Sequence, residues 1–298
     1  MIAVIADDFT GAAELAGISL RYGLSVAVHL DNNIDADADV VIVSTDSRSM
    51  QRAAAVYCTA DAVEAVQQCK PSLLYKKIDS VLRGYVVDEV KVQMELCEKS
   101  KVLILPANPS LQRTISNGEY FIYGKKITTT GFVKDPEFPV SSDSVTAMVK
   151  DETVQVAKHS DWLPLEGIVI GEAATTADME GWAAAIDESW MLAGAGDFFN
   201  ALLQNRYAQA FTNSTTTQEH EHVVRVLEAM SEGVSFTTLE HSAACDALAV
   251  LRPRLPKVEK ARAIAQAFHY AGRPYDFNFD FSTDAELVCT ELIYKAYE

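Results

Sequence analysis

Short apolar runs alternate with helix-spaced apolar positions along the first two thirds of this 298-residue chain. Strand-length runs rich in Val, Ile and Leu occupy residues 2–6, 25–30, 40–44, 73–77, 102–105 and 167–171. Segments with apolar residues at helical spacing lie between them, at residues 11–21, 51–69, 84–97 and 176–187. Nearly continuous apolar strands separated by amphipathic helices are typical of a parallel sheet covered on both faces. The pattern predicts an α/β fold with a doubly wound, mostly parallel sheet, to which residues 119–130 add a hairpin.

The pattern changes after residue 203. The polar stretch Thr-Asn-Ser-Thr-Thr-Thr-Gln at residues 212–218 has no apolar period and is typical of a linker. We therefore expect a first domain at residues 1–203, a linker at 204–222 and a smaller α+β domain at 223–298. Within that smaller domain the pattern predicts strands at 223–229 and 247–252, and helices at 258–271 and from residue 289 onward.

The formal net charge of -17 argues against binding to nucleic acid or to an anionic membrane surface, because phosphate affinity comes from Lys and Arg. The apolar runs are far shorter than the roughly 20 residues that span a bilayer. The first residues lack the basic start of a signal peptide, so we expect a cytoplasmic protein. Its five cysteines form no CxxC motif, which predicts neither a disulfide framework nor a metal site. Cys58, Cys69 and Cys97 fall in helical patterns and are expected to be small buried hydrophobes.

Two adjacent carboxylates follow the first predicted strand. Asp7 and Asp8 stand at its carboxyl end, directly before a helix opened by Thr10-Gly11. Open α/β sheets bind ligands at this edge. Paired carboxylates repel phosphate, but they suit substrate hydroxyls, a cation or the proton of an attacking alcohol, which makes Asp8 the candidate catalytic residue. The alternative is that Asp8 or Thr10 only caps the helix.

Further polar clusters follow other predicted strands: Thr-Asp-Ser-Arg at residues 45–48, Lys-Lys-Ile-Asp-Ser-Val-Leu-Arg-Gly at 76–84, and Pro-Ala-Asn-Pro at 106–109 with Arg113. Together they would supply cations for a ligand carboxylate and carboxylates for its hydroxyl groups. A polyhydroxy acid is the ligand that uses both. The candidate substrate-binding residues are Asp7, Asp8, Asp46, Arg48, Lys77, Asp79 and Arg83.

The same motifs resemble those of the four-carbon acid sugar kinases. The resemblance rests on residues 6–12 and 45–48, on 77–84, and on the stretch from Pro106 through Arg113 and Asn117-Gly118 to Asp135-Pro136. It covers about the first two hundred residues and implies the substrate-binding domain of enzymes that phosphorylate threonate- or erythronate-like acids with ATP and Mg²⁺. The family continues into a nucleotide-binding domain with glycine-rich loops, and no such loop follows here. We expect this chain to bind the sugar acid; a separate nucleotide-binding subunit and a homo-oligomer both remain open.

A second candidate site lies near the other end of the chain. Residues 282–288 lead into Cys289, after which apolar residues return at helical spacing. A thiol in the first turn of a helix is acidified by the helix dipole and by free backbone N–H groups, as in thiol nucleophiles. The alternative is an ordinary buried cysteine.

The surroundings of Cys289 resemble the circularly permuted papain-like amidases and peptidases related to lecithin retinol acyltransferase. The segments concerned are 228–234, 250–253, 272–281 and 289–292. The family's histidine precedes its cysteine, which makes His222 and His220 the candidate bases. The chain stops soon after Cys289, so we expect a fragment or a degenerate fusion. Three functions stay open: a sugar-acid-binding, kinase-related protein, a cysteine amidase or peptidase using Cys289, and a non-catalytic binding protein.

Overall fold

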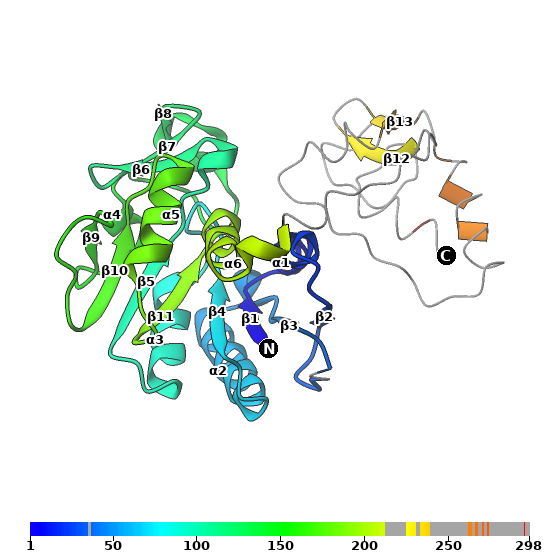
Figure 1. Cartoon of the computed structure of the whole chain (residues 1–298). Helices are drawn as coiled ribbons and strands as arrows, with labels where there is room; N and C mark the ends of the chain where they lie inside the picture. Colours follow the sequence, from blue (N-terminus) through cyan, green and yellow to red (C-terminus); the bar gives the residue numbers. More distant parts are fainter. Residues whose placement is uncertain are drawn as a thin grey trace. The chain divides into compact units, whose positions relative to one another are not determined.

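The computed structural model describes residues 1–34, 37–211, 225–230 and 233–238, and the short pieces 262–263, 266–267, 270, 273 and 295. The chain divides into two compact units, Met1–Thr217 and Gln218–Glu298 (Figure 1).

An eight-stranded sheet forms the centre of the first unit, and each neighbouring pair of its strands is parallel. In spatial order the strands are β2 (Val26–His29), β3 (Val40–Ser44), β1 (Ile2–Ala6), β4 (Leu73–Lys77), β11 (Trp190–Gly194), β5 (Lys101–Leu105), β10 (Gly167–Gly171) and β9 (Gln155–Ala157). Strands β1 and β3, which both have neighbours on each side, are buried along their whole length, which explains their uninterrupted apolar sequence. The prediction of a mostly parallel α/β sheet is confirmed.

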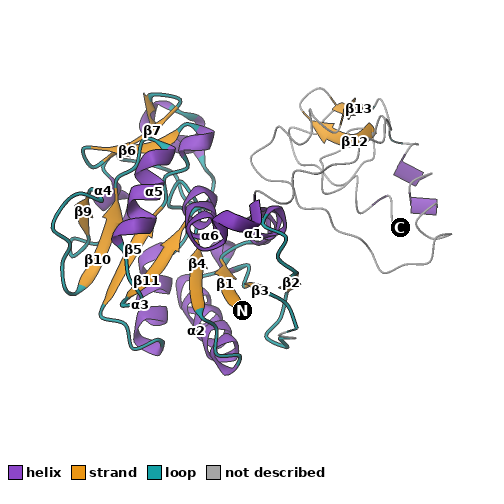
Figure 2. Ribbon diagram, in the orientation of Figure 1, coloured by secondary structure: helices purple, strands orange, loops and turns teal. Residues whose placement is uncertain are grey.

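Helices cover both faces of this sheet (Figures 1 and 2). On one face α1 (Phe9–Arg21) and α5 (Thr176–Ala185) pack against α6 (Gly196–Phe211); on the other face α2 (Arg52–Gln68) packs against α3 (Val86–Leu96). Successive side chains of β4 point to opposite faces of the sheet. The Tyr75 ring lies against Phe199 of α6 on one face, and Lys76 reaches Glu89 of α3 on the other. The chain thus leaves β1 toward one face and β4 toward the other. The carboxyl ends of β1 and β4 therefore form a topological switch point, the usual ligand site of such sheets.

The predicted hairpin does not join the main sheet, and that part of the prediction is wrong. Strands β6 (Arg113–Ser116), β7 (Glu119–Ile122) and β8 (Lys125–Lys126) form a separate antiparallel sheet. The reason is the Asn117-Gly118 turn, whose positive φ angles of 52° and 73° match a two-residue hairpin loop. This turn folds β6 back onto β7, so β7 pairs with the strand next to it in sequence and not with a strand of the main sheet.

The end of the first unit also differs from the expected boundary. Helix α6 continues to Phe211, through residues assigned to the linker, because residues 204–211 contain good helix formers and neither Gly nor Pro. In the second unit, β12 (Arg225–Met230) pairs antiparallel with β13 (Gly233–Thr238), and β12 matches the strand predicted at 223–229. The strand predicted at 247–252 lies outside the described residues.

The remaining elements of the first unit are short: the helix α4 (Val145–Val149) and the 3-10 turns η1 (Ser47–Ser49), η2 (Pro109–Leu111), η3 (Ile127–Thr129) and η4 (Gly131–Lys134). Cys58, Cys69 and Cys97 are half-buried, so the expectation of full burial is corrected. Among the helices of the described ranges, none has the length and apolar character needed to cross a bilayer.

Candidate functional site

Asp7 and Asp8 lie where β1 meets α1, as predicted. The side chain of Asp7 is buried, with 5% of its surface exposed, whereas that of Asp8 is 20% exposed. Asp8 caps α1, because its Oδ1 accepts a hydrogen bond from the Gly11 backbone N–H at 2.8 Å. Its other oxygen is turned toward Arg48, so Asp8 is a helix cap and a member of the site at once.

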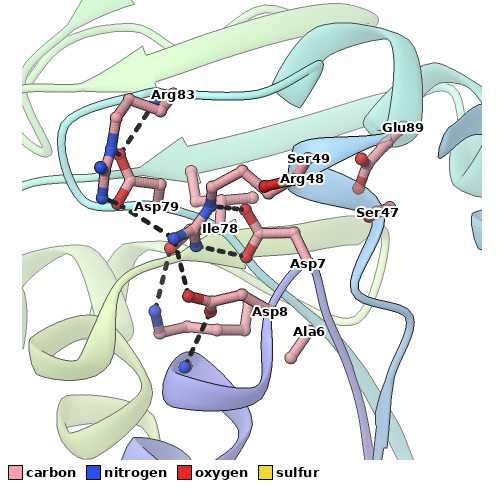
Figure 3. Close-up of polar contacts among 12 residues, drawn as sticks. Ala6, Asp7, Asp8, Ser47, Arg48, Ser49, Ile78, Asp79, Arg83 and Glu89 are labelled. Carbon is pink, nitrogen blue, oxygen red and sulfur yellow. Dashed lines mark hydrogen bonds and ion pairs between the residues drawn. The ribbon is translucent and has the colours of Figure 1, made fainter. Parts of the chain in front are cut away.

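Arg48 joins both carboxylates from the η1 turn that follows β3 (Figure 3). Its Nε and Nη2 donate to the two oxygens of Asp7, each at 2.9 Å, and its Nη1 donates to Asp8 Oδ2 at 2.7 Å. Burial disfavours the charged guanidinium, but Asp7, aided by Asp79 and Asp8, outweighs this effect and raises the pKa of Arg48. The bidentate geometry fixes the guanidinium plane against β1.

Arg83 and Asp79 form a second pair in the loop after β4. Arg83 donates to Asp79 through Nε at 2.9 Å, through Nη2 at 3.0 Å and through its backbone N–H at 3.0 Å. Burial raises the pKa of Asp79, but the Arg83 hydrogen bonds and the charges of Arg48 and Arg83 bring it below its usual value. On its other side the Arg83 guanidinium donates to Asp135 Oδ2 at 3.1 Å and lies over the Phe132 ring.

Lys77 approaches the same site from the last position of β4. Its Nζ lies 3.0 Å from Glu14 Oε2 on α1 and donates to the Ile78 carbonyl at 3.1 Å. Gly11 allows this approach: a Cβ there would lie 2.9 Å from Lys77 Nζ and 2.7 Å from Asp8 Oδ1. The absence of a side chain at residue 11 is therefore a steric requirement of the site.

The structure brings six of the seven predicted binding residues together, and Asp46 is the exception. It begins the η1 turn in a left-handed conformation, at φ 51°, and is exposed to solvent. Sequence reasoning missed Glu14, the partner of Lys77, because nothing in a helical pattern distinguishes one acidic residue from another. It also did not assign Asp135 to the site, although the stretch used for the family resemblance includes it.

Residues of the small sheet support the loop between β4 and α3. Arg113 Nη1 donates to Ser80 Oγ at 2.6 Å, and the buried Tyr120 hydroxyl donates to the Ser80 carbonyl at 2.7 Å. Beside Arg83 a cavity of about 430 Å³ lies between the start of α3 and residues 137–141. Val86, Phe138 and Met148 are among its walls.

The charge balance limits what this site can bind. Its cations are Arg48, Lys77 and Arg83, and its carboxylates are those of Asp7, Asp8, Glu14, Asp79 and Asp135. The carboxylates outnumber the cations and offer acceptors for ligand hydroxyl groups. Of the cations, Arg83 is the most open, with 29% of its side chain exposed against 13% for Arg48 and 6% for Lys77. No group of three or more His, Cys, Asp or Glu side chains in the described ranges is arranged to hold a metal ion.

The second candidate site cannot be placed in the same way, because Cys289, His220 and His222 lie outside the described residues.

Two family models match the chain. Residues 2–202 match the sugar-binding N-terminal domain, and residues 167–298 match the permuted papain-like amidase enzyme, YaeF/YiiX, C92 family. The two matches overlap in the last part of the main sheet, which includes β10 and β11.

Curated relatives match the first unit. A D-threonate kinase of Salmonella typhimurium is 34% identical over 152 residues, which are 49% of this chain and 35% of that protein. A D-erythronate kinase of Heliobacterium modesticaldum is 30% identical over 180 residues, 58% of this chain and 40% of that protein. The chain thus spans well under half the length of these two kinases.

Solved structures share the fold. A domain of unknown function from Bordetella bronchiseptica, with bound citrate and as a domain-swapped dimer, has a TM-score of 0.60 at 24% identity, over 68% of this chain and 55% of that one. A Haemophilus influenzae protein has a TM-score of 0.62 at 18% identity, over 78% and 60%. With the sugar-binding model covering residues 2–202, the chain belongs to the family of sugar-binding N-terminal domains of the four-carbon acid sugar kinases.

Proposed function

We propose that the first unit binds a four-carbon sugar acid of the threonate or erythronate type at the carboxyl ends of β1 and β4, as the substrate-binding part of an ATP-dependent sugar-acid kinase. The observation that carries the proposal is the network in which Asp79 links Arg48 to Arg83 at the switch point of the sheet, with the Lys77–Glu14 pair as a further cation and carboxylate there. The named relatives, a D-threonate kinase and a D-erythronate kinase, support this class of ligand.

Each part of such a ligand has a counterpart at the switch point. The ligand hydroxyls would donate to Asp7 and Asp8, whose oxygens keep lone pairs beyond those used by Arg48 and Gly11. The ligand carboxylate would share Arg83, the most exposed cation, and would lie toward Lys77. Asp8 is the proposed base for the reacting hydroxyl, because it is more exposed than Asp7 or Asp79 and is held in place by the helix start.

ATP would supply the transferred phosphoryl group, with Mg²⁺ neutralising its charge. The residues described here do not fit a metal ion, because the Arg48 guanidinium already lies among Asp7, Asp8 and Asp79. We therefore assign this chain the binding and orientation of the acid and no step that passes through the metal. Phosphoryl transfer would need a nucleotide-binding part, which we propose lies in another subunit or in a longer chain.

Calorimetry with D-threonate, D-erythronate and citrate tests the proposal. We expect a four-carbon acid to bind, and Arg83→Ala to weaken that binding by about 1.5–3 kcal/mol, roughly 10- to 150-fold in Kd, through loss of a charge-assisted pair. Arg21→Ala is the matched control, because Arg21 is an exposed arginine at the far end of α1. Unchanged affinity in Arg83→Ala would remove Arg83 from the site, and no binding of any four-carbon acid would refute the function.

A second candidate function is supported by the amidase match over residues 167–298. In this alternative Cys289 is the nucleophile, and His222 or His220 is its base. Hydrolysis of an amide substrate by the full chain, abolished by Cys289→Ala and unaffected by Cys58→Ala, would favour it. A cytoplasmic location and a homo-oligomer also remain proposals, which fractionation and light scattering would test.

A further inference from the structure

We infer that the buried ion pair between Lys76 and Glu89 is a positioning device for the loop that carries Asp79 and Arg83. The inference rests on the proposed function, because the loop is positioned correctly when Asp79 and Arg83 can bind the sugar acid. The two residues bracket the loop: Lys76 is the last-but-one residue of β4, and Glu89 lies in the first turn of α3.

The pair is hidden from solvent. Lys76 Nζ lies 2.5 Å from Glu89 Oε2, and the two side chains are 0% and 2% exposed. Lys76 points to the α2–α3 face of the sheet, whereas its neighbour Lys77 points to Glu14 on the α1 face. The end of β4 therefore supplies Lys77 to the proposed binding site and Lys76 to the contact with α3 on the opposite face of the sheet.

Stability alone does not account for this pair. Two charges removed from water need further hydrogen bonds to offset the lost solvation. Within the described residues Lys76 Nζ, Glu89 Oε1 and both polar atoms of Gln93, one helical turn beyond Glu89, have no well-directed hydrogen-bond partner. Apolar side chains of similar volume would therefore hold α3 on the sheet at least as well.

The pair provides a link of fixed length and direction, which apolar contacts do not. The loop between Lys76 and Glu89 bears Asp79, whose Oδ1 is 3.8 Å from Arg48 Nη1, and Arg83, which is bound to Asp79. Arg48 itself is fixed to β1 through Asp7. A small slide of α3 along β4 would shift the Asp79–Arg83 half of the site against the β1 half and spoil a geometry that binding requires within fractions of an ångström.

The double variant Lys76→Met/Glu89→Leu tests this role in the full chain. We expect its melting temperature to equal or exceed that of the wild type, while its affinity for D-threonate falls at least tenfold and amide hydrogen exchange in residues 78–85 becomes faster. The matched control is Lys91→Met, which removes a half-exposed lysine of the same helix from its ion pair with Asp151 and should change neither quantity. Wild-type affinity and wild-type exchange in the Lys76→Met/Glu89→Leu protein would overturn the inference.

The reversed pair, Lys76→Glu/Glu89→Lys, decides the matter if the apolar variant fails to fold. It keeps an ionic link across the same two positions, so it should retain affinity within about threefold and wild-type exchange in the loop. A folded reversed pair that has lost both would overturn the inference. If the wild type binds no four-carbon acid, the proposed function fails, and the exchange measurement still reports on the pair.

Discussion

Replacing Arg48 by Met should destabilise the first unit more than any substitution of an exposed charge. The change keeps an apolar chain in place of the aliphatic part of the arginine but removes the guanidinium that lies among Asp7, Asp8 and Asp79. Asp79 keeps Arg83 as a partner, whereas Asp7 loses a bidentate ion pair in a buried position.

The size of the effect follows from burial. The side chains of Asp7 and Asp8 are 5% and 20% exposed, so water can replace the lost contact at Asp8 but hardly at Asp7. Removing one partner of a buried pair costs about 3–5 kcal/mol, because the other charge stays buried without compensation. Arg52→Met is the matched control: Arg52 is 70% exposed in its pair with Asp88, and exposed pairs contribute about 1 kcal/mol or less.

Tryptophan fluorescence in urea measures this effect in the full chain. All three tryptophans, Trp162, Trp182 and Trp190, belong to the first unit, and the last two are buried. The signal therefore reports on the unfolding of that unit alone.

A cost below about 1 kcal/mol, or one equal to that of Arg52→Met, would refute the reasoning. It would mean that the carboxylates around Arg48 are adequately solvated without it.

Three further outcomes are expected. The folded-state pKa of Asp79 lies below its usual value, so its contribution to stability should be complete above about pH 4 and decline as the pH falls through that pKa; an Asp79→Asn protein, followed by urea titrations against pH, should lack this step. Gly11→Ala should lower stability by about 1–3 kcal/mol and weaken sugar-acid binding, measured by urea titration and calorimetry, because its Cβ would press on Asp8 Oδ1 at 2.7 Å; unchanged binding would count against that crowding. Cys289 should react with limiting iodoacetamide at neutral pH before Cys58, Cys69 or Cys97, as read by mass spectrometry, and slower labelling would favour a structural cysteine.

The amino-acid sequence is enough to predict the parallel sheet and the edge of the sheet where the charged residues gather. Period and composition identify β1 and β3, because buried parallel strands must be apolar along their whole length. Polar residues directly after such strands must meet at one edge, which is why Asp7, Arg48 and Arg83 were predicted as neighbours. The limits of this reasoning appear at β11, whose strand-like run was not recognised before α6.

The pairing of the charged side chains, in contrast, cannot be predicted from local sequence. The partners of Lys77 and Arg83 include Glu14 and Asp135, which are 63 and 52 residues away in the chain and carry no local signal of their role. The same holds for Lys76 and Glu89. Strand alternation predicts that Lys76 and Lys77 point to opposite faces of the sheet, but it does not identify the carboxylate that each lysine meets. Pairing depends on which helix covers which face, and that is set by long-range packing and by the handedness of the crossovers, neither of which is local in sequence.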